Sequence, residues 1–192
     1  MVNRSLKTVL AKLTLADIKA MKPRPAIMAF ARDCGGDMQK FWDTCPNGDW
    51  LLWLLRKTGR LNELQARKVA LAYAKKVLPI FEKHQPFDDG PRLCLAAIET
   101  YIKNPTVANQ RAMIAAAYEA HSSYTAYAAA AAAYHAAYYR CDTAAADYAV
   151  HFATAAADVI KADHSFCSTI DNKTRKKFEK WGANKVRSLI KQ

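Results

Sequence analysis

Apolar residues recur every three or four positions along most of the chain, which is the spacing of one face of an α-helix. The pattern is interrupted wherever proline and glycine cluster. Proline restricts the residue before it and glycine tolerates positive φ angles, so both residues favour helix ends. The pattern predicts helical segments over residues 5–20, 25–33, 61–84, 91–103, 106–120, 123–140, 143–162 and 171–191.

Polar residues at the expected helix ends refine these boundaries. Thr14 followed by Asp17 has the spacing of a capping box, so a second helix is expected to begin inside the first segment. Asp37 is predicted to cap a short helical turn. Asp49 is predicted to be the N-cap of the leucine-rich helix that follows it, and Gly59 is predicted to stop that helix.

Alanine dominates the second half of the chain, where it supplies 22 of the 50 residues from 111 to 160. Alanine has the highest helix propensity, and the whole chain holds only 6 glycines and 7 prolines. A length of 192 residues suits one domain with its own core. The sequence therefore predicts an all-α, single-domain multi-helix bundle with an alanine- and tyrosine-rich C-terminal half.

Four tyrosines in this half share one narrow helical face, since they fall at the spacing of successive turns: Tyr124, Tyr127, Tyr134 and Tyr138. In one interpretation they are core residues that fill gaps between alanine-lined helices. In the other they form an aromatic wall that anchors a partner. Tyr127, Tyr134 and Tyr138 are therefore candidate partner-binding residues.

The formal net charge of +12 favours an anionic partner such as nucleic acid, an anionic membrane surface or an acidic protein. No charged residue lies between Glu119 and Arg140, but this stretch is rich in Ala and Tyr and should not insert into a bilayer. The start of the chain lacks the features of a secretory signal. The five cysteines form no C-x-x-C pair, so reduced thiols in a cytoplasmic protein are expected.

The tryptophan-rich segment gives a second candidate surface. Trp50 and Trp53 follow Asp49 at the predicted helix start. Core packing accounts for both rings, because exposing them would create a large apolar patch. A rim of Asp49, Trp50 and Trp53 at the helix start would instead form a binding edge.

The turn before the helix at residues 91–103 gives a third candidate. Asp88 and Asp89 stand beside Arg92 at a helix N-terminus, where a carboxylate is favoured by the helix dipole. Helix capping with a local Asp–Arg pair is one interpretation. A recognition turn formed by Asp88, Asp89 and Arg92 is the other.

No nucleophile, phosphate-binding or dinucleotide motif occurs in the sequence, so we expect neither an enzyme nor a cofactor. Asp147 and His151 lie one helical turn apart, and His135 or Cys141 would complete a metal site if the fold brought them close. A small-ligand or metal-dependent enzyme centred on these tyrosine- and histidine-rich helices is kept as an alternative.

Residues 25–165 resemble the Imm5-like family of bacterial immunity proteins. The resemblance rests on three short elements: Cys45-Pro46-x-x-x-Trp50-Leu51, Asp89-x-x-Arg92, and alanine-rich helices ending in Ala-Ala-Ala-Asp158. It divides the chain into an N-terminal helical segment at 1–24, a core at 25–165 and a basic C-terminal helix at 166–192.

This resemblance implies an all-α inhibitor that neutralises a toxin by binding it directly, with Trp50, Leu51, Asp89 and Arg92 matching the family pattern. A phage-encoded anti-defence protein on the same scaffold would act in the same way. The positive charge requires an acidic or neutral protein partner. The alternative function is a nucleic-acid-binding protein that uses the basic terminal helices. The alanine-rich helices with their aromatic residues also favour a homodimer.

Overall fold

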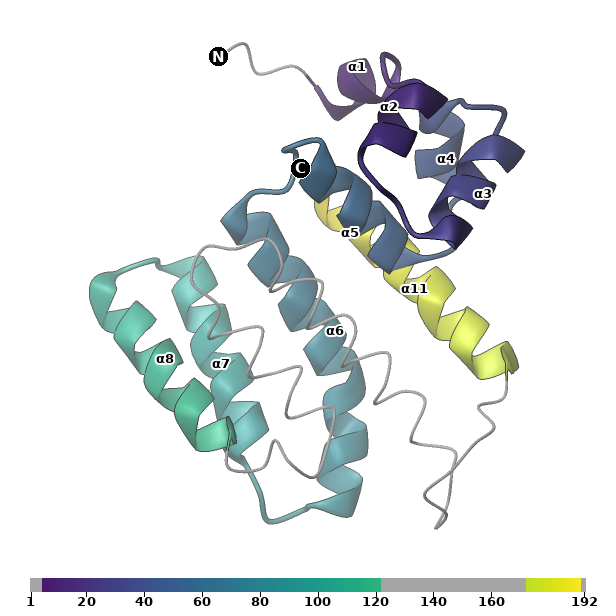
Figure 1. Ribbon diagram of the computed structural model, residues 1–192. Helices are drawn as coiled ribbons and strands as arrows, with labels where there is room; N and C mark the ends of the chain where they lie inside the picture. The colour runs from purple at the N-terminus through teal and green to yellow at the C-terminus, as the bar shows by residue number, and fades with distance from the viewer. Residues whose placement is uncertain (1–4, 122–171, 191–192) are drawn as a thin grey trace.

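The computed structural model describes residues 5–121 and 172–190, and all regular secondary structure in these residues is α-helical, as the sequence predicts. The helices pack into a single helical domain (Figure 1). They are α1 (Leu6–Leu10), α2 (Leu15–Ala20), α3 (Pro25–Asp33), α4 (Met38–Thr44), α5 (Gly48–Lys57), α6 (Glu63–His84), α7 (Gly90–Lys103), α8 (Val107–His121) and α11 (Asn172–Ile190). The helices expected at 123–140 and 143–162 lie outside the described residues.

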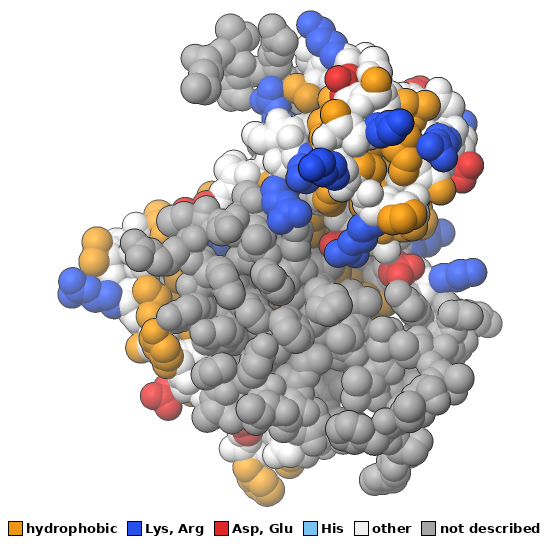
Figure 2. Space-filling view, in the orientation of Figure 1, with side chains coloured by type: hydrophobic (Ala, Val, Ile, Leu, Met, Phe, Trp, Pro, Cys, Tyr) orange, Lys and Arg blue, Asp and Glu red, His pale blue; other side chains and the backbone are white. Residues whose placement is uncertain are grey.

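Helices α1 to α4 are short and form a cluster at one end of the molecule (Figure 1). The segment expected at 5–20 is two helices, because Thr14 and Asp17 form the predicted capping box: each accepts a hydrogen bond from the other's backbone N–H. The Thr14 hydrogen bonds lower the pKa of Asp17. On this cluster Figure 2 shows Lys and Arg side chains around apolar atoms, so part of the net charge gathers there.

The start of α5 differs from the prediction by two residues. Asn47, not Asp49, is the N-cap, since its side chain accepts a hydrogen bond from the Asp49 N–H at 2.9 Å. Asp49 lies within the first helical turn, where its carboxylate still faces the positive end of the helix dipole. Gly59 has a φ of 64° directly after the C-cap residue, which confirms the predicted stop.

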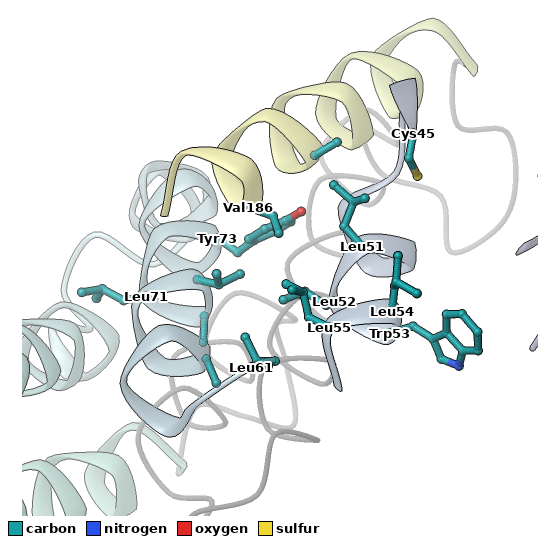
Figure 3. Packing of buried hydrophobic residues seen from close by; sticks show 14 of the residues in the cluster. Cys45, Leu51, Leu52, Trp53, Leu54, Leu55, Leu61, Leu71, Tyr73 and Val186 are labelled. Carbon is teal, nitrogen blue, oxygen red and sulfur yellow. The ribbon is translucent and has the colours of Figure 1, made fainter. Parts of the chain in front are cut away.

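Helix α5 supplies much of the core, because four of its leucines are almost fully buried. Figure 3 shows Leu52 and Leu55 directed toward α6, whereas Trp53 points to the other side of α5. Burying one such side chain stabilises the fold by about 1.5–3 kcal/mol. This helix is therefore a structural centre of the described domain.

Helix α6 begins with a second capping box, in which Asn62 and Gln65 each bind the other's backbone N–H. Pro79 lies inside α6, yet the helix continues to His84. Helix α7 packs between α6 and α8. Arg67 is 7% exposed and joins these three helices: it binds Glu63 at 2.9 Å, approaches the Met113 sulfur at 3.7 Å and stacks over the Tyr101 ring.

Helix α11 returns from the far end of the sequence to lie against α5 and α6 (Figure 1). Close approach depends on Gly48 in α5 and Gly182 in α11, since a Cβ at either position would clash with the Tyr73 hydroxyl. Arg187 fixes the contact, because it donates to the carbonyl oxygens of Trp42 at 2.7 Å and Cys45 at 2.5 Å. Among the described helices, none combines the length and hydropathy needed to cross a membrane.

Candidate functional site

A groove of ≈ 470 Å³ runs between α6, α7 and α11. We call it the lysine groove and define it by its lining residues: Lys68, Leu71, Ala72, Lys75 and Lys76 of α6, Glu99, Ile102 and Lys103 of α7, and Trp181, Lys185 and Leu189 of α11. Among these described lining residues five lysines stand against one glutamate, so this part of the chain makes the groove positive. Its volume lies in the usual range for ligand sites, about 300–1,000 Å³.

Regular helical spacing places each of these side chains in the groove. The α6 residues follow an i, i+3, i+4, i+7, i+8 pattern, which is one continuous helix face. On α11, Trp181, Lys185 and Leu189 are four residues apart and form a straight row. Phe178 and Val186 of the same helix are buried, so α11 is anchored to the core while Trp181, Lys185 and Leu189 line the groove.

Two contacts show which residues lie at the same level of the groove. The Lys75 Nζ is 2.5 Å from the Glu99 carboxylate, and the Lys76 Nζ lies 5.5 Å from the centre of the Trp181 ring. Helices α7 and α11 both run opposite to α6 (Figure 1). Lys103 and Leu189, which lie further along their helices, are therefore toward the Lys68 end.

The charges of the groove are only partly balanced. Lys75 is the lysine that pairs with Glu99. Lys68, Lys103 and Lys185 form no ion pair with any carboxylate in the part of the chain that the structure describes. Between the lysines, Leu71, Ile102 and other apolar residues form the floor. The arrangement can bind an anionic group at either end and an apolar group in the middle.

Trp181 contributes the aromatic part of the groove wall and is held firmly. Its ring centre is 5.2 Å from that of Tyr73 and 5.5 Å from that of Phe178. Burial raises the pKa of the Tyr73 hydroxyl, so this ring stays neutral. The wall is thus a preformed feature of the core, with the Lys76 ammonium over the indole.

The tryptophan-rich candidate residues take part in internal contacts. Asp49 pairs with Arg24 at 3.1 Å, which joins the starts of α5 and α3. Trp50 is half-buried and lies 5.7 Å from the Phe30 ring, centre to centre. Trp53 is only 9% exposed. The structure brings Asp49 and Trp50 together at the start of α5, but most of the Trp53 surface is covered.

In the Asp88–Arg92 turn, Arg92 pairs with a carboxylate from outside the turn. The Arg92 Nε donates to Glu82, at the end of α6, over 2.6 Å, and this carboxylate raises the pKa of Arg92. Asp88 accepts a hydrogen bond from the Gly90 N–H, whereas the Asp89 side chain makes no capping bond. The turn also carries Phe87, which is 99% exposed, so its surface remains open to a partner.

Sequence reasoning missed the lysine groove because its residues come from three helices that are distant in the sequence. One local signal was present: Lys68, Lys75 and Lys76 recur at seven and eight residues, which places three positive charges on one helix face. The α7 and α11 residues that complete the groove do not form a short sequence motif that could be recognised.

The tyrosines Tyr127, Tyr134 and Tyr138, and the metal set suggested around Asp147 and His151, lie outside the described residues. Within residues 5–121 and 172–190, no three His, Cys, Asp or Glu side chains converge as a metal site would require. Comparisons of the chain with protein-family models, with curated proteins and with solved structures gave no significant match. The function is therefore inferred from the groove.

Proposed function

We propose that this chain is a non-enzymatic binding protein that inhibits a partner protein by direct association, and that the partner presents an acidic surface to the lysine groove. The observation that carries the proposal is the groove itself, with five lysines around an apolar floor on three packed helices. Electrostatic complementarity accelerates association and excludes wrong partners. The apolar floor offers a place for the buried anchor residues that supply most of the binding energy.

The chemistry of the groove favours a protein over nucleic acid. The cations among the described residues of the groove are lysines, whereas arginine is the residue preferred for bidentate phosphate recognition. Single-stranded nucleic acid also stacks its bases on aromatic faces. Trp181 is the aromatic residue among the described groove residues, and it already contacts Lys76, Tyr73 and Phe178. A chain of carboxylate side chains fits these features better than a row of stacked bases.

The resemblance to bacterial immunity proteins supports inhibition as the purpose of binding. A toxin neutralised in the producing cell and a defence effector blocked by a phage protein are the two forms of this proposal. A toxin gene or an early phage operon beside this gene would separate them. Buried thiols at Cys34, Cys45 and Cys94 suit action in the reducing cytoplasm.

The proposal is tested by affinity purification of the tagged full chain from its native host. A groove variant, Lys76→Glu with Lys103→Glu, reverses two exposed groove charges, and a control, Lys12→Glu with Lys57→Glu, makes the same charge change on exposed lysines elsewhere. We expect the wild type and the control to recover one acidic protein in stoichiometric amount and the groove variant to lose it. Recovery of the same protein by the groove variant, or of no stoichiometric protein by any form, contradicts the proposal.

Nucleic acid is the second candidate partner, because exposed Lys176, Lys177 and Lys180 continue the positive charge of α11 beyond the groove. Phosphate contacts would make the affinity fall steeply with rising salt. A gel shift with oligothymidine at low salt that disappears in the groove variant would favour this candidate. Absence of any shift at low salt removes it.

A further inference from the structure

The two ends of the lysine groove carry lysines and the floor between them is apolar, with Lys185 on the α11 wall between the two ends. Lys75 and Lys76 of α6 mark one end, and Lys68 of α6 with Lys103 of α7 marks the other. Between them lie Leu71 and Ala72 of α6 and Ile102 of α7. A ligand that pairs with the lysines at both ends and covers the floor therefore carries two separated anionic groups with apolar surface between them.

The distance between the ends follows from helix geometry. Lys68 and Lys75 are seven residues apart on α6, which corresponds to about 10.5 Å at 1.5 Å per residue. A second helix lying along α6 has the same rise, so its residues i and i+7 reach the same two levels. Its residues i+3 and i+4 lie on that same face, opposite the apolar floor.

We infer that the groove binds a short amphipathic acidic helix of the partner, with carboxylates at i and i+7 and apolar side chains at i+3 and i+4. This inference rests on the proposed function and names the element of the acidic partner that enters the groove. An amphipathic helix in a groove is a recurring mode of protein recognition. The groove lies between α6 and two helices that run antiparallel to it. Rows of side chains on packed helices leave grooves into which the side chains of a further helix can fit.

Charge complementarity selects this occupant over a second copy of the chain. The described helices that carry exposed apolar residues, such as α8 with Val107, lack paired carboxylates at this spacing. Glu99 competes with the ligand for Lys75, so a ligand carboxylate at that end meets Lys75 together with Lys76, and one at the other end meets Lys68 and Lys103. Recognition is thus expected to need at least two acidic residues, one for each end.

The test uses two synthetic alanine-based peptides of about 16 residues, long enough to form an isolated helix. Both have the same composition, with glutamates at i and i+7. The first has leucines at i+3 and i+4, on the glutamate face, and the second has them at i+2 and i+5, on the opposite face. Fluorescence anisotropy of each labelled peptide is followed during titration with the full chain, the Lys76→Glu/Lys103→Glu groove variant and the Lys12→Glu/Lys57→Glu control.

We expect the first peptide to bind about tenfold more tightly than the second, or more, because only its leucines are buried on the floor. The control should bind like the wild type, and the groove variant should bind neither peptide. Equal affinity for the two peptides, or no binding of either, contradicts the inference that an acidic helix enters the groove. The capture of an acidic partner from the native host tests the proposed function separately. Tighter binding of oligothymidine than of both peptides overturns the inference in favour of nucleic acid.

Discussion

Lys75 and Glu99 form an ion pair across the floor of the groove, with the Lys75 Nζ 2.5 Å from the Glu99 Oε1. The pair joins α6 to α7 and places the groove's carboxylate directly on one of its lysines. Both side chains are more than a third exposed, so the pair contributes little to stability. Its main consequence is electrostatic, because an incoming carboxylate must compete with Glu99 for Lys75.

Glu99→Gln should therefore strengthen the binding of an acidic ligand. The substitution removes the competing charge while keeping the shape of the side chain. Exposed ion pairs are worth about 0.2–1 kcal/mol, so affinity for the glutamate- and leucine-bearing peptide should rise by a factor of about 1.4 to 5. The matched control is Glu82→Gln, which makes the same charge change where Glu82 pairs with Arg92 outside the groove. An equal rise in both variants would show that only net charge matters, and no rise in Glu99→Gln would contradict competition.

Arg187 is expected to be important for stability. It is the link through which α11 holds the carbonyl oxygens of Trp42 and Cys45. Burial lowers the pKa of Arg187, although the group remains a cation at neutral pH. Arg187→Ala leaves both carbonyls without this donor and should lower the free energy of unfolding by about 1–3 kcal/mol. Urea denaturation measures the loss, and Ser188→Ala, at an exposed neighbour, should change stability far less.

The crossing of α5 and α11 depends on small residues beside Tyr73. Gly48→Ala would place a methyl group against the Tyr73 hydroxyl and 2.9 Å from the Gly182 carbonyl carbon. Overpacking of this kind typically costs about 1–3 kcal/mol. Adding Tyr73→Phe removes the hydroxyl, so the double variant should recover part of the loss in thermal denaturation. If Tyr73→Phe gives no recovery, the contact with the hydroxyl is not what limits this crossing.

The Cys45 thiol should react slowly at alkaline pH. Burial raises the pKa of Cys45 from 9.0 to about 11, even though the Asn47 backbone hydrogen bond opposes the shift. The folded state thus favours the neutral thiol, and the stability it contributes is complete below pH 9 and is lost as the pH rises toward 11. Alkylation by iodoacetamide at pH 9, followed by peptide mapping, should label Cys45 far more slowly in the folded chain than in urea. Similar rates in the two states would contradict the burial.

Local features of the fold were predictable because each depends on a few neighbouring residues. The Thr14–Asp17 capping box and the stop at Gly59 follow from hydrogen bonding and positive φ alone. Asp49 was misassigned as the N-cap because Asn47, two residues earlier, has the same capping ability. The sequence offered Asp88 and Asp89 as one interpretation of the partners of Arg92, whereas the fold also brings Glu82 to this side chain.

The groove was not predictable from the sequence, since it exists only where α11 returns to α6. That return is set by Gly182, Tyr73 and Arg187, which are tertiary contacts without a short-range signature. The prediction of an all-α single domain needed only helical periodicity, and it is confirmed for the described residues. The candidate residues in the tyrosine-rich half remain predictions, because they lie outside those residues.

Binding in the lysine groove is tested most directly by hydrogen–deuterium exchange of the full chain with and without the acidic partner recovered from the native host. Amides of residues 68–76, 99–103 and 181–189 should exchange more slowly in the complex, since the groove is lined from these three segments. A contradicting result would be slower exchange confined to residues 49–53 at the start of α5 or to the turn at 88–92, with the three groove segments unchanged. The partner would then bind at one of these two helix starts instead of the groove.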